Sequence, residues 1–403
     1  MTKTNENYIK EILKEHSGYY GINRGEFALV SCRNGRITES KIKKHLEDIC
    51  TDRKENIIKK YDETKKISDY EYRQLQLINY IDRNGVKIID SEIRDFKDGE
   101  IKLKIDDSIT GKDVYVIQNT LNPRMPQYTS HNILELELMV DALLRSESAH
   151  VNLILPYMSY SKQERRQGRE PISAKRLIDK IVDCGAERIT TMDLHADAIE
   201  GFTSSKNCRI QNLYASSILL NYFIDDLNLD CIWIAPDPGA GKKVKHYSKV
   251  TGYPMALGYK YRDPEKMHEI EEQKLLGKIK GKNVAIIDDQ TAGSSTMLEM
   301  AKTAKNFGAN KIYCGVTHGM LLEDGEYKFK EAKKNNIIES LVMTDTLIQP
   351  QDFLERNKDW LVVKDALHMF ADAIFETHVN GSISRLYKLS LRRSMYGKRH
   401  KSL

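Results

Sequence analysis

Short apolar runs alternate with helical patterns along most of this chain. Runs of strand-forming residues lie at 114–117, 151–155, 189–192, 231–234, 284–287, 312–315 and 338–343. Between them, apolar side chains recur at three- and four-residue spacing over 133–144 and 171–185, which predicts amphipathic helices. This alternation predicts βα units stacked around central parallel sheets flanked by helices, an α/β fold. In such folds, ligands bind at the carboxyl ends of the strands.

The segment 283–296 carries the most informative polar pattern. An apolar run predicts a buried strand over 284–287, and the paired carboxylates of Asp288 and Asp289 follow it directly. A loop of small residues then leads to apolar positions that are spaced as in a helix over 297–307. The chain therefore places carboxylates and a small-residue loop between a strand and the start of a helix.

This loop predicts a phosphate site. Backbone N–H groups and the helix dipole favour an anion there, and Ser294, Ser295 and Thr296 add hydroxyl donors. Asp288 and Asp289 suit hydroxyl groups or a metal ion beside that phosphate. The alternative is an ordinary strand, loop and helix in which the same residues only cap the helix, because helix capping favours the same residue types.

Composition limits the classes of protein that the chain can form. With 403 residues it is long enough for two domains, and an apolar fraction of 40% is typical of a soluble globular protein. There is no apolar run of membrane-helix length and no signal-like apolar core at the N-terminus, so we expect a cytoplasmic protein that does not bind membranes. Six cysteines without a C-x-x-C pair predict reduced, structural thiols. A net charge of +5 is too small to indicate nucleic acid as the main partner.

Residues 41–83 are dense in charged side chains and tyrosine, with few leucines and isoleucines. We interpret this stretch as a charged helical insertion and not as a third catalytic domain. Its charges form either a solvated face or a surface for a partner, and the solvated face is the more common case.

A strongly basic loop follows the strand expected at 151–155. Its cationic side chains, together with one just downstream, are Lys162, Arg165, Arg166, Arg169 and Lys175. Cations at this density beside a strand end favour a polyphosphate ligand. A solvated basic loop is the alternative, because protein surfaces are normally rich in Lys and Arg.

Two further polar residues follow strands. His195 comes just after the run at 189–192, and Asp237 lies in a glycine-bearing turn after the run at 231–234. One imidazole and one carboxylate suit Mg²⁺, which retains waters and needs few protein ligands. A lone histidine is more often a structural residue. A nucleotide P-loop is excluded here, because Lys243 stands where that motif requires Ser or Thr.

Two more segments carry candidate ligand contacts. Lys260 and Arg262 alternate, so an extended backbone would place both cations on one face, where they could clamp a phosphoryl group. Phe96 with Asp98 and Glu100 suits stacking on a base and accepting hydrogen bonds from an amine or a ribose. By spacing alone, the second segment is an ordinary turn.

Taken in order, these segments resemble the ribose-phosphate diphosphokinase family, also called phosphoribosyl pyrophosphate synthetase. The resemblance covers roughly residues 88–390. The segments that carry it are 95–100, 157–175, 193–202, 236–240, 260–262, 288–296, 344–347 and 381–387. The Asp-Leu-His-Ala block at 193–196 and the Gln-Glu-Arg-Arg loop at 163–166 are its most specific parts.

The resemblance implies two type I phosphoribosyltransferase-like domains, each with a central parallel sheet. We expect an N-terminal domain over 1–213 that includes the insertion at about 41–83, and a C-terminal domain over 214–365. The C-terminal helix and tail, 366–403, are expected to pack on the N-terminal domain. The family's ATP site lies between the domains and is completed by a loop of a neighbouring subunit, which implies a homo-oligomer, at least a dimer and commonly a hexamer.

The implied reaction transfers diphosphate from MgATP to the C1 hydroxyl of ribose 5-phosphate and releases AMP. Carried over by motif, the residues fall into four groups. Those for ATP are Phe96, Asp98, Gly99, Glu100, Lys162, Gln163 and His195; those for Mg²⁺ are His195 and Asp237; the catalytic cations are Lys260 and Arg262; and those for ribose 5-phosphate are Arg262, Asp288, Asp289, Ala292, Gly293, Ser294, Ser295 and Thr296.

The chain departs from the family's pattern in places that keep two alternatives open. The loop from Ala292 to Thr296 lacks a carboxylate that the family usually has, and Lys162 replaces a usual Arg fork by a point charge. One alternative is a catalytically weak regulatory homologue of such a synthetase. The other is a phosphoribosyltransferase, which the ATP-type residues Asp98 and Gln163 and the missing acid at Ala292 disfavour.

Overall fold

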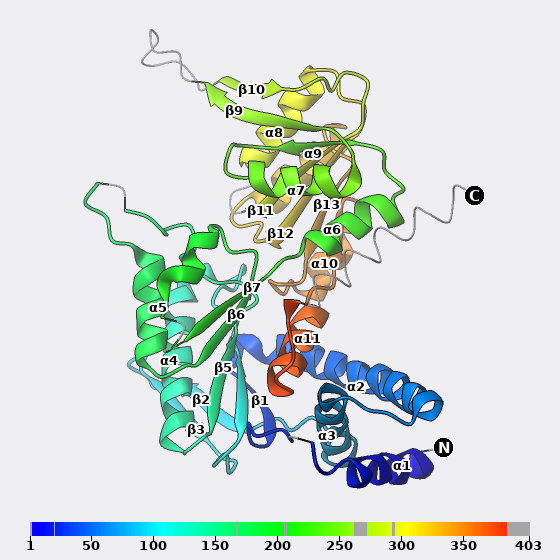
Figure 1. The fold of residues 1–403 in the computed structure, drawn as a ribbon. Helices are drawn as coiled ribbons and strands as arrows, with labels where there is room; N and C mark the ends of the chain where they lie inside the picture. The colour runs from blue at the N-terminus through cyan, green and yellow to red at the C-terminus, as the bar shows by residue number, and fades with distance from the viewer. Residues whose placement is uncertain are drawn as a thin grey trace. The chain divides into compact units, whose positions relative to one another are not determined.

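The structure is a computed structural model that describes residues 2–19, 21–166, 168–204, 206, 208–261, 272–291 and 295–384. The chain forms two compact units, each built around its own sheet (Figure 1). The first unit contains the chain up to Leu213 together with a segment that begins at Leu367. The second unit extends from Tyr214 to Ala366.

A five-stranded parallel sheet, in the order β1, β4, β5, β6, β7, forms the centre of the first unit. A separate antiparallel hairpin is formed by β2 and β3. The helices and strands of this unit are α1 (Thr2–Glu15), β1 (Phe27–Ser31), α2 (Arg36–Thr64), α3 (Asp69–Asn84), β2 (Ser91–Asp95), β3 (Ile101–Ile105), β4 (Asp113–Ile117), α4 (Thr129–Arg145), β5 (His150–Ile154), α5 (Ser173–Asp183), β6 (Arg188–Met192), β7 (Arg209–Leu213) and α11 (Leu367–His378).

The central strands of this sheet are buried on both faces, which explains their continuous apolar sequences. On one face, Val116 and Leu153 pack with Leu136 of α4 and Leu177 of α5. On the other face, the Phe27 ring lies 5.3 Å from the imidazole of His378, on α11. Side chains of successive residues point to opposite faces, so each strand serves both layers.

The segment 41–83 spans most of α2, the short connection at 65–68 and most of α3. Its few apolar residues are turned inward, with Leu46 and Cys50 of α2 and Ile78 of α3 fully or almost fully buried. A capping box fixes the start of α3, because Ser68 accepts a hydrogen bond from the Glu71 N–H while the Glu71 carboxylate accepts one from the Ser68 N–H. Both helices are therefore packed parts of the first unit.

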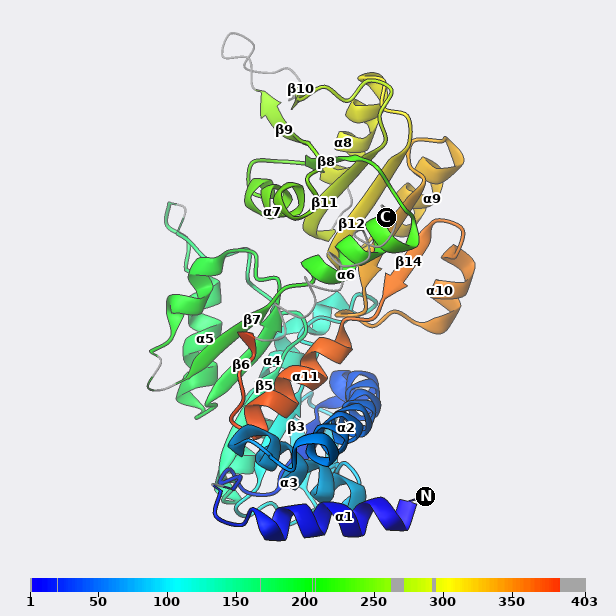
Figure 2. The same ribbon diagram turned by 45° about the vertical axis from the view of Figure 1, so that its right-hand side comes forward.

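Arg53 of α2 is the centre of a cluster of ion pairs with α11. Its guanidinium lies 2.7 Å from Glu376 Oε1 and 2.9 Å from Asp372 Oδ1. It also lies 4.3 Å from the centre of the Phe375 ring, and Tyr70 of α3 donates a hydrogen bond of 2.6 Å to Glu376. These contacts hold α2 and α11, which are far apart in sequence, side by side (Figure 2).

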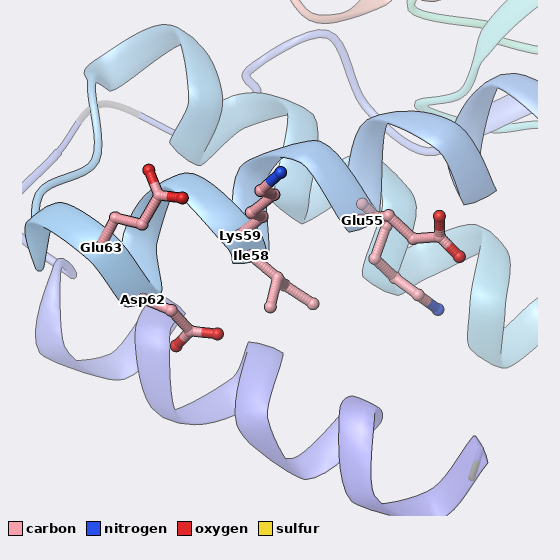
Figure 3. Close-up of a pocket in the computed structure, with 6 residues that line it drawn as sticks. Glu55, Ile58, Lys59, Asp62 and Glu63 are labelled. Carbon is pink, nitrogen blue, oxygen red and sulfur yellow. The ribbon is translucent and has the colours of Figure 1, made fainter.

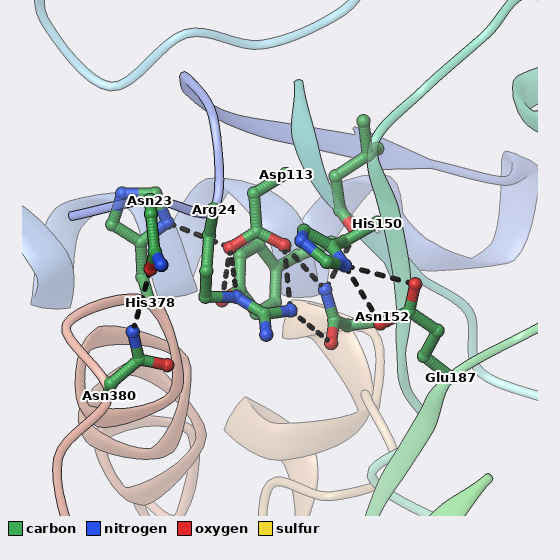
Figure 4. A network of polar contacts seen from close by, with 10 residues as sticks. Asn23, Arg24, Asp113, His150, Asn152, Glu187, His378 and Asn380 are labelled. Atoms are coloured by element: carbon green, nitrogen blue, oxygen red, sulfur yellow. Dashed lines mark hydrogen bonds and ion pairs between the residues drawn. The ribbon is translucent and has the colours of Figure 1, made fainter. Parts of the chain in front are cut away.

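A second buried network surrounds the carboxylate of Asp113, at the start of β4 (Figure 4). Arg24 donates to both of its oxygens, at 2.9 and 3.1 Å. The His378 Nδ1 atom lies 2.8 Å from Oδ2, Tyr115 donates to Oδ2 at 3.0 Å and Asn152 donates to Oδ1 at 2.8 Å. Burial raises the pKa of Asp113, but the bonds from His378 and Arg24 outweigh it and lower the pKa from 3.8 to about 2.

A seven-stranded sheet, in the order β10, β9, β8, β11, β12, β13, β14, forms the centre of the second unit. β9 and β10 pair antiparallel, and the other neighbours pair parallel. The helices and strands of this unit are α6 (Ser216–Asn221), β8 (Ile232–Ala235), α7 (Gly241–Thr251), β9 (Met255–Tyr261), β10 (Glu272–Leu276), β11 (Val284–Thr291), α8 (Ser295–Asn306), β12 (Ile312–Gly319), α9 (Gly325–Lys334), β13 (Ser340–Thr344), α10 (Gln351–Asn357) and β14 (Leu361–Lys364).

Alternate residues of these strands face two separate cores. Ile286 packs in a core with Met300 of α8, whereas its neighbour Ile287 belongs to the core on the opposite face. In that second core, Trp233 of β8 packs edge-to-face against Tyr247 of α7, with ring centres 5.3 Å apart. The prediction of parallel sheets flanked by helices is thus confirmed.

Within the part of the chain that the structure describes, each helix is too short or too polar to cross a lipid bilayer. All six cysteines lie in this part and are free thiols.

Replacing Arg53 with methionine should lower the free energy of unfolding by about 3–5 kcal/mol, because the buried Glu376 carboxylate would lose its cation. Lys60→Met on the same helix is the matched control, since Lys60 is half-exposed in its pair with Glu71 and should contribute less than about 1 kcal/mol. Urea denaturation followed by circular dichroism measures both. Equal losses for the two variants would contradict the role given to Arg53.

The ionisation of Asp113 should make the free energy of unfolding depend on pH between about pH 4 and pH 2. Its folded pKa of about 2 lies below the ordinary value of 3.8, so its stabilising effect is present above about pH 4 and is lost as the pH falls toward 2. The difference in free energy of unfolding between the wild type and Asp113→Asn should therefore shrink across that window. A difference that stays constant from pH 5 to pH 2 in urea denaturation would contradict the assignment.

Candidate active site

Strand β11 carries the paired carboxylates of the second unit. It extends to Thr291, so the prediction that the strand ends before Asp288 is wrong. Parallel pairing with β12 continues past the carboxylates, with Asp288 opposite Val316 and Gln290 opposite His318, and this pairing keeps the polar residues in the strand. Both carboxylates lie at the carboxyl end of β11, just before α8 begins at Ser295.

Asp288 is held in an environment that disfavours its charge. Burial contributes most, the negative charge of Asp289 comes next, and together they raise the pKa of Asp288 from 3.8 to about 7. The charge of Asp237 acts in the same direction. The Asp289 N–H, which donates to Asp288 Oδ1 at 2.9 Å, and the charge of Lys243 act against it. Among the described residues, negative charge therefore outweighs positive charge around Asp288.

Asp237 follows β8, the parallel neighbour of β11. Its Oδ1 atom accepts a hydrogen bond of 3.1 Å from the Ala240 N–H, which shapes the turn into α7. In the first turn of α7, the Lys243 ammonium lies 3.5 Å from Thr317 Oγ1 of β12. Lys243 therefore lies near the carboxyl ends of the central strands, a placement that the sequence analysis missed because it considered this lysine only as part of a P-loop.

The remaining candidates of the second unit are only partly described. Lys260 lies in β9, which pairs with β10, so the backbone is extended at this position as the alternation with Arg262 requires. Ser295 and Thr296 form the first residues of α8, where Ser295 is exposed and Thr296 is half-buried. Arg262, Ala292, Gly293 and Ser294 lie outside the described residues.

His195 lies in the loop that follows β6 in the first unit, and its side chain is exposed. The loop leaves the strand through Asp193, whose φ of 42° is in the left-handed region. The Asp193 N–H donates to the Leu213 carbonyl at 2.8 Å, and the Leu194 N–H donates to the Asn212 side chain at 3.1 Å. Bonds to β7 and its side chains thus fix the backbone just before His195.

Lys162 and Gln163 lie in the loop between β5 and α5, and both side chains are exposed. The backbone around them is tied down at three points. Tyr160 adopts a left-handed φ of 64°, the Gln163 N–H donates to the Tyr160 carbonyl at 2.8 Å, and the Ala174 N–H donates to the Gln163 carbonyl at 3.2 Å. The two polar side chains are thus presented from a defined turn beside the start of α5.

Phe96, Asp98, Gly99 and Glu100 form the turn of the β2–β3 hairpin. The Phe96 N–H donates to the Glu100 carbonyl at 2.8 Å, and the Gly99 N–H donates to the Phe96 carbonyl at 3.0 Å. Gly99 has a φ of 91°, which requires glycine, and the Asp98 carboxylate accepts from the Glu100 N–H at 3.1 Å. The Phe96 ring is 48% exposed, which leaves it available to stack on a ligand.

The chemistry of the donors fits Mg²⁺. Mg²⁺ prefers oxygen ligands and keeps several waters, so one or two protein ligands are enough. In the second unit Asp237 supplies a carboxylate at a strand end, and in the first unit His195 carries an exposed imidazole, so each unit by itself offers one candidate ligand. Among the described residues, no three His, Cys, Asp or Glu side chains gather into a closed metal site, and Mg²⁺ does not require one.

A groove of about 440 Å³ lies along α2, and none of the candidate residues lines it (Figure 3). Its lining mixes both signs of charge around one apolar side chain, and the lining residues are Lys54, Glu55, Ile58, Lys59, Asp62 and Glu63. Mixed charges of this kind are typical of a solvated helix surface.

Two family profiles match the chain. Residues 31–185 match the N-terminal domain of ribose phosphate pyrophosphokinase, and residues 264–388 match a phosphoribosyl synthetase-associated domain.

Whole proteins match as well. The ribose-phosphate pyrophosphokinase of Caldanaerobacter subterraneus subsp. tengcongensis is 34% identical over 305 residues, which are 75% of this chain and 91% of that protein. The one of Listeria ivanovii is 34% identical over 308 residues, with the same shares of both chains. The crystal structure of phosphoribosylpyrophosphate synthetase from Mycobacterium smegmatis matches with a TM-score of 0.71 at 23% identity, over 88% of this chain and 100% of that chain, which shows a shared fold.

The raised pKa of Asp288 predicts how the second unit responds to pH. Because the folded pKa of about 7 lies above the ordinary 3.8, the stabilising effect is fully present below about pH 4 and is lost as the pH rises through 7. Asp288→Asn should therefore stabilise this unit strongly at pH 8 and much less at pH 4, where the carboxyl is largely protonated in the folded state and the pH is close to its ordinary pKa in the unfolded state. Trp233 and Trp360 are both buried in this unit, so their fluorescence during urea denaturation without Mg²⁺ measures the effect. An equal effect at the two pH values would contradict the shift.

Proposed function

The chain belongs to the ribose-phosphate pyrophosphokinase family, and we propose that it transfers diphosphate from MgATP to the C1 hydroxyl of ribose 5-phosphate. The C1 oxygen forms a bond to the β-phosphorus of ATP, the bond from that phosphorus to the α,β-bridging oxygen breaks, and AMP leaves. The hydroxyl proton passes to solvent. The similarity to curated ribose-phosphate pyrophosphokinases over 91% of their length is the observation that carries this proposal.

The second unit is proposed to bind ribose 5-phosphate. Asp288 and Asp289 would accept hydrogen bonds from the ribose hydroxyls. Ser295 and Thr296, together with the preceding loop 292–294, would bind the 5-phosphate, because they stand at the N-terminus of α8, where free N–H groups and the helix dipole favour an anion. A phosphate there would also supply hydrogen-bond acceptors to N–H groups that no helical carbonyl can reach.

The first unit is proposed to bind ATP. Phe96 would stack on the adenine ring of a nucleotide bound by a neighbouring subunit, and Asp98, Gly99 and Glu100 would contact the polar edge or the ribose of that nucleotide. Lys162 and Gln163 would contact the nucleotide from the loop after β5. Lys162 attracts phosphate as a flexible point charge and lacks the planar fork of an arginine, so its contact is less directional.

Charge neutralisation is proposed as the main source of catalysis. Bound Mg²⁺ would withdraw charge from the phosphate oxygens, and His195 and Asp237 would help to hold it. Lys260 and Arg262 would donate hydrogen bonds to the nonbridging oxygens as charge develops on them. Cations that are already in place lower the barrier because they need not reorganise during the reaction.

Two properties of the family complete the proposal. We infer a homo-oligomer, dimer-based or hexameric. In this family, the hairpin that corresponds to residues 95–100 reaches a neighbouring subunit and completes the ATP site there. We also infer a location in the cytoplasm, where ATP and sugar phosphates are available.

The altered loop from Ala292 to Thr296 favours one second candidate function. Ala292 stands where the family usually has a carboxylate, which removes one acceptor for the ribose hydroxyls. A chain that binds nucleotide but turns over poorly would then act as a regulatory homologue of an active synthetase. Asp288 and Asp289 remain as acceptors, so the active enzyme is the first proposal.

Incubation with MgATP and ribose 5-phosphate should produce AMP, measured by chromatography of the nucleotides. Lys260→Ala should keep its fold and lose about a hundredfold to a thousandfold in the rate of AMP formation, because one preorganised donor is removed. Lys278→Ala, at an exposed lysine after β10, is the matched control and should keep the wild-type rate.

Three results would contradict parts of this account. Formation of ADP indicates a simple kinase, and nucleotide binding without turnover favours the regulatory homologue. Near-full turnover by Lys260→Ala removes that residue from the mechanism.

A further inference from the structure

Arg33 connects three separate segments of the first unit at the base of the β2–β3 hairpin. It lies just after β1 and directs its guanidinium at Asp95, the last residue of β2. Its two terminal nitrogens donate to the two oxygens of Asp95, at 2.8 and 2.9 Å. Its Nε donates to Glu135 Oε2 of α4 at 2.6 Å, and its backbone N–H donates to Glu135 Oε1 at 2.6 Å.

Glu135 and Asp95, the two carboxylates that bind Arg33, differ in how deeply they are buried. The Glu135 side chain is 1% exposed, so its two bonds fix Arg33 firmly against α4. The Asp95 side chain is 41% exposed and belongs to the hairpin. Arg33, whose side chain is 31% exposed, is therefore anchored to a buried carboxylate through its Nε and its backbone, and its two terminal nitrogens hold the hairpin strand next to its turn.

The hairpin needs such a support. β2 and β3 pair only with each other among the described strands, and an isolated two-stranded hairpin is marginally stable in water. Its apolar residues Ile93, Leu103 and Ile101 pack on the core of the unit, and Ile101 stands opposite Asp95, at the end of the strands before the turn. The turn with Phe96 extends beyond that packing, and Asp95 is the residue directly before it.

Other groups face this pair as well. The His131 Nε2 atom of α4 lies 2.8 Å from the Arg33 guanidinium and 3.3 Å from Asp95 Oδ1. The bond from Arg33 is the main cause that lowers the pKa of Asp95, so this carboxylate stays charged at neutral pH. The fork between Arg33 and Asp95 is thus present throughout the physiological range.

We propose that Arg33, through its fork to Asp95, is a positioning residue for ATP, because it sets the place of the Phe96 turn that contacts the nucleotide. The inference rests on the proposed function of that turn. A bound adenine stacks on Phe96 only when the Phe96 ring is held at the correct distance and orientation. An unsupported turn would have to be ordered by the nucleotide itself, and this cost would appear as weaker binding.

Asp95→Ala tests the proposal while the Arg33–Glu135 pair remains in place, so the unit keeps its fold. The dissociation constant of ATP, measured by calorimetry on the whole protein, should rise about tenfold, the effect of losing one charge-assisted bidentate pair. The dissociation constant of ribose 5-phosphate should stay unchanged. Hydrogen exchange of the Phe96 and Gly99 amides should become faster. Asp95→Glu, which keeps the carboxylate, should restore most of the ATP affinity.

Asp106→Asn is the matched control. Asp106 lies just past the end of β3, on the side away from the turn, and forms an exposed pair with Lys104, so its loss should change neither ATP affinity nor exchange at the turn. Unchanged ATP affinity in Asp95→Ala, or faster exchange with no loss of affinity, would overturn the positioning role. Failure of the proposed function can be distinguished from failure of the positioning role. In that case the wild type would form no AMP, while the calorimetry and the exchange data on the variants would still decide the role of Arg33.

Discussion

Parallel strand pairing is the constraint on which the candidate residues at the strand ends of each unit depend. It brings the carboxyl ends of neighbouring strands to one edge of a sheet, so residues far apart in sequence become neighbours. In the second unit, Asp237 follows β8 and Asp288 lies in β11, and their charges influence each other because these strands are paired. The cost of this geometry is crowded negative charge. The charge of Lys243 acts against this crowding, and the proposed Mg²⁺ would add to the compensation.

In the first unit, arginines neutralise buried carboxylates. Arg24, Arg33 and Arg53 each reach carboxylates on other segments, and in each case at least one carboxylate is almost fully buried. A buried carboxylate without a cation is strongly destabilising, so each arginine and its partners specify one arrangement of the chain. Arg53 fixes the charged α2 and α3 region against α11, so this region is part of the architecture and more than a solvated surface. Arg33 uses the same principle at the edge of the unit, where it reaches the hairpin that carries Phe96.

Much of the fold was predictable, because both sheets are buried on two faces and their central strands have continuous apolar sequences. β4, β5, β11 and β12 are clear from this signal, and α4 and α5 from their apolar spacing. β11 was predicted too short because its second half is polar, and β1, β2, β3, β7, β10 and β14 were not predicted. The contacts of Arg33 and Arg53 could not be read from the sequence, since the partners are 62 and 323 positions away and nothing local marks them. Short motifs identified the candidate residues. The location of Lys243 near the strand ends depends on the turn after β8, so it could be recognised only from the structure.

In the proposed reaction, both outer phosphates of ATP move together to a sugar. Phosphorus NMR of a reaction with MgATP and ribose 5-phosphate tests this most directly, because it identifies the position of each phosphorus. The account predicts that the α-phosphorus appears in AMP and that the β- and γ-phosphorus appear together as a diphosphate ester on C1 of the sugar phosphate. Transfer of the γ-phosphorus alone, with ADP as the other product, or an unchanged ATP spectrum would contradict it.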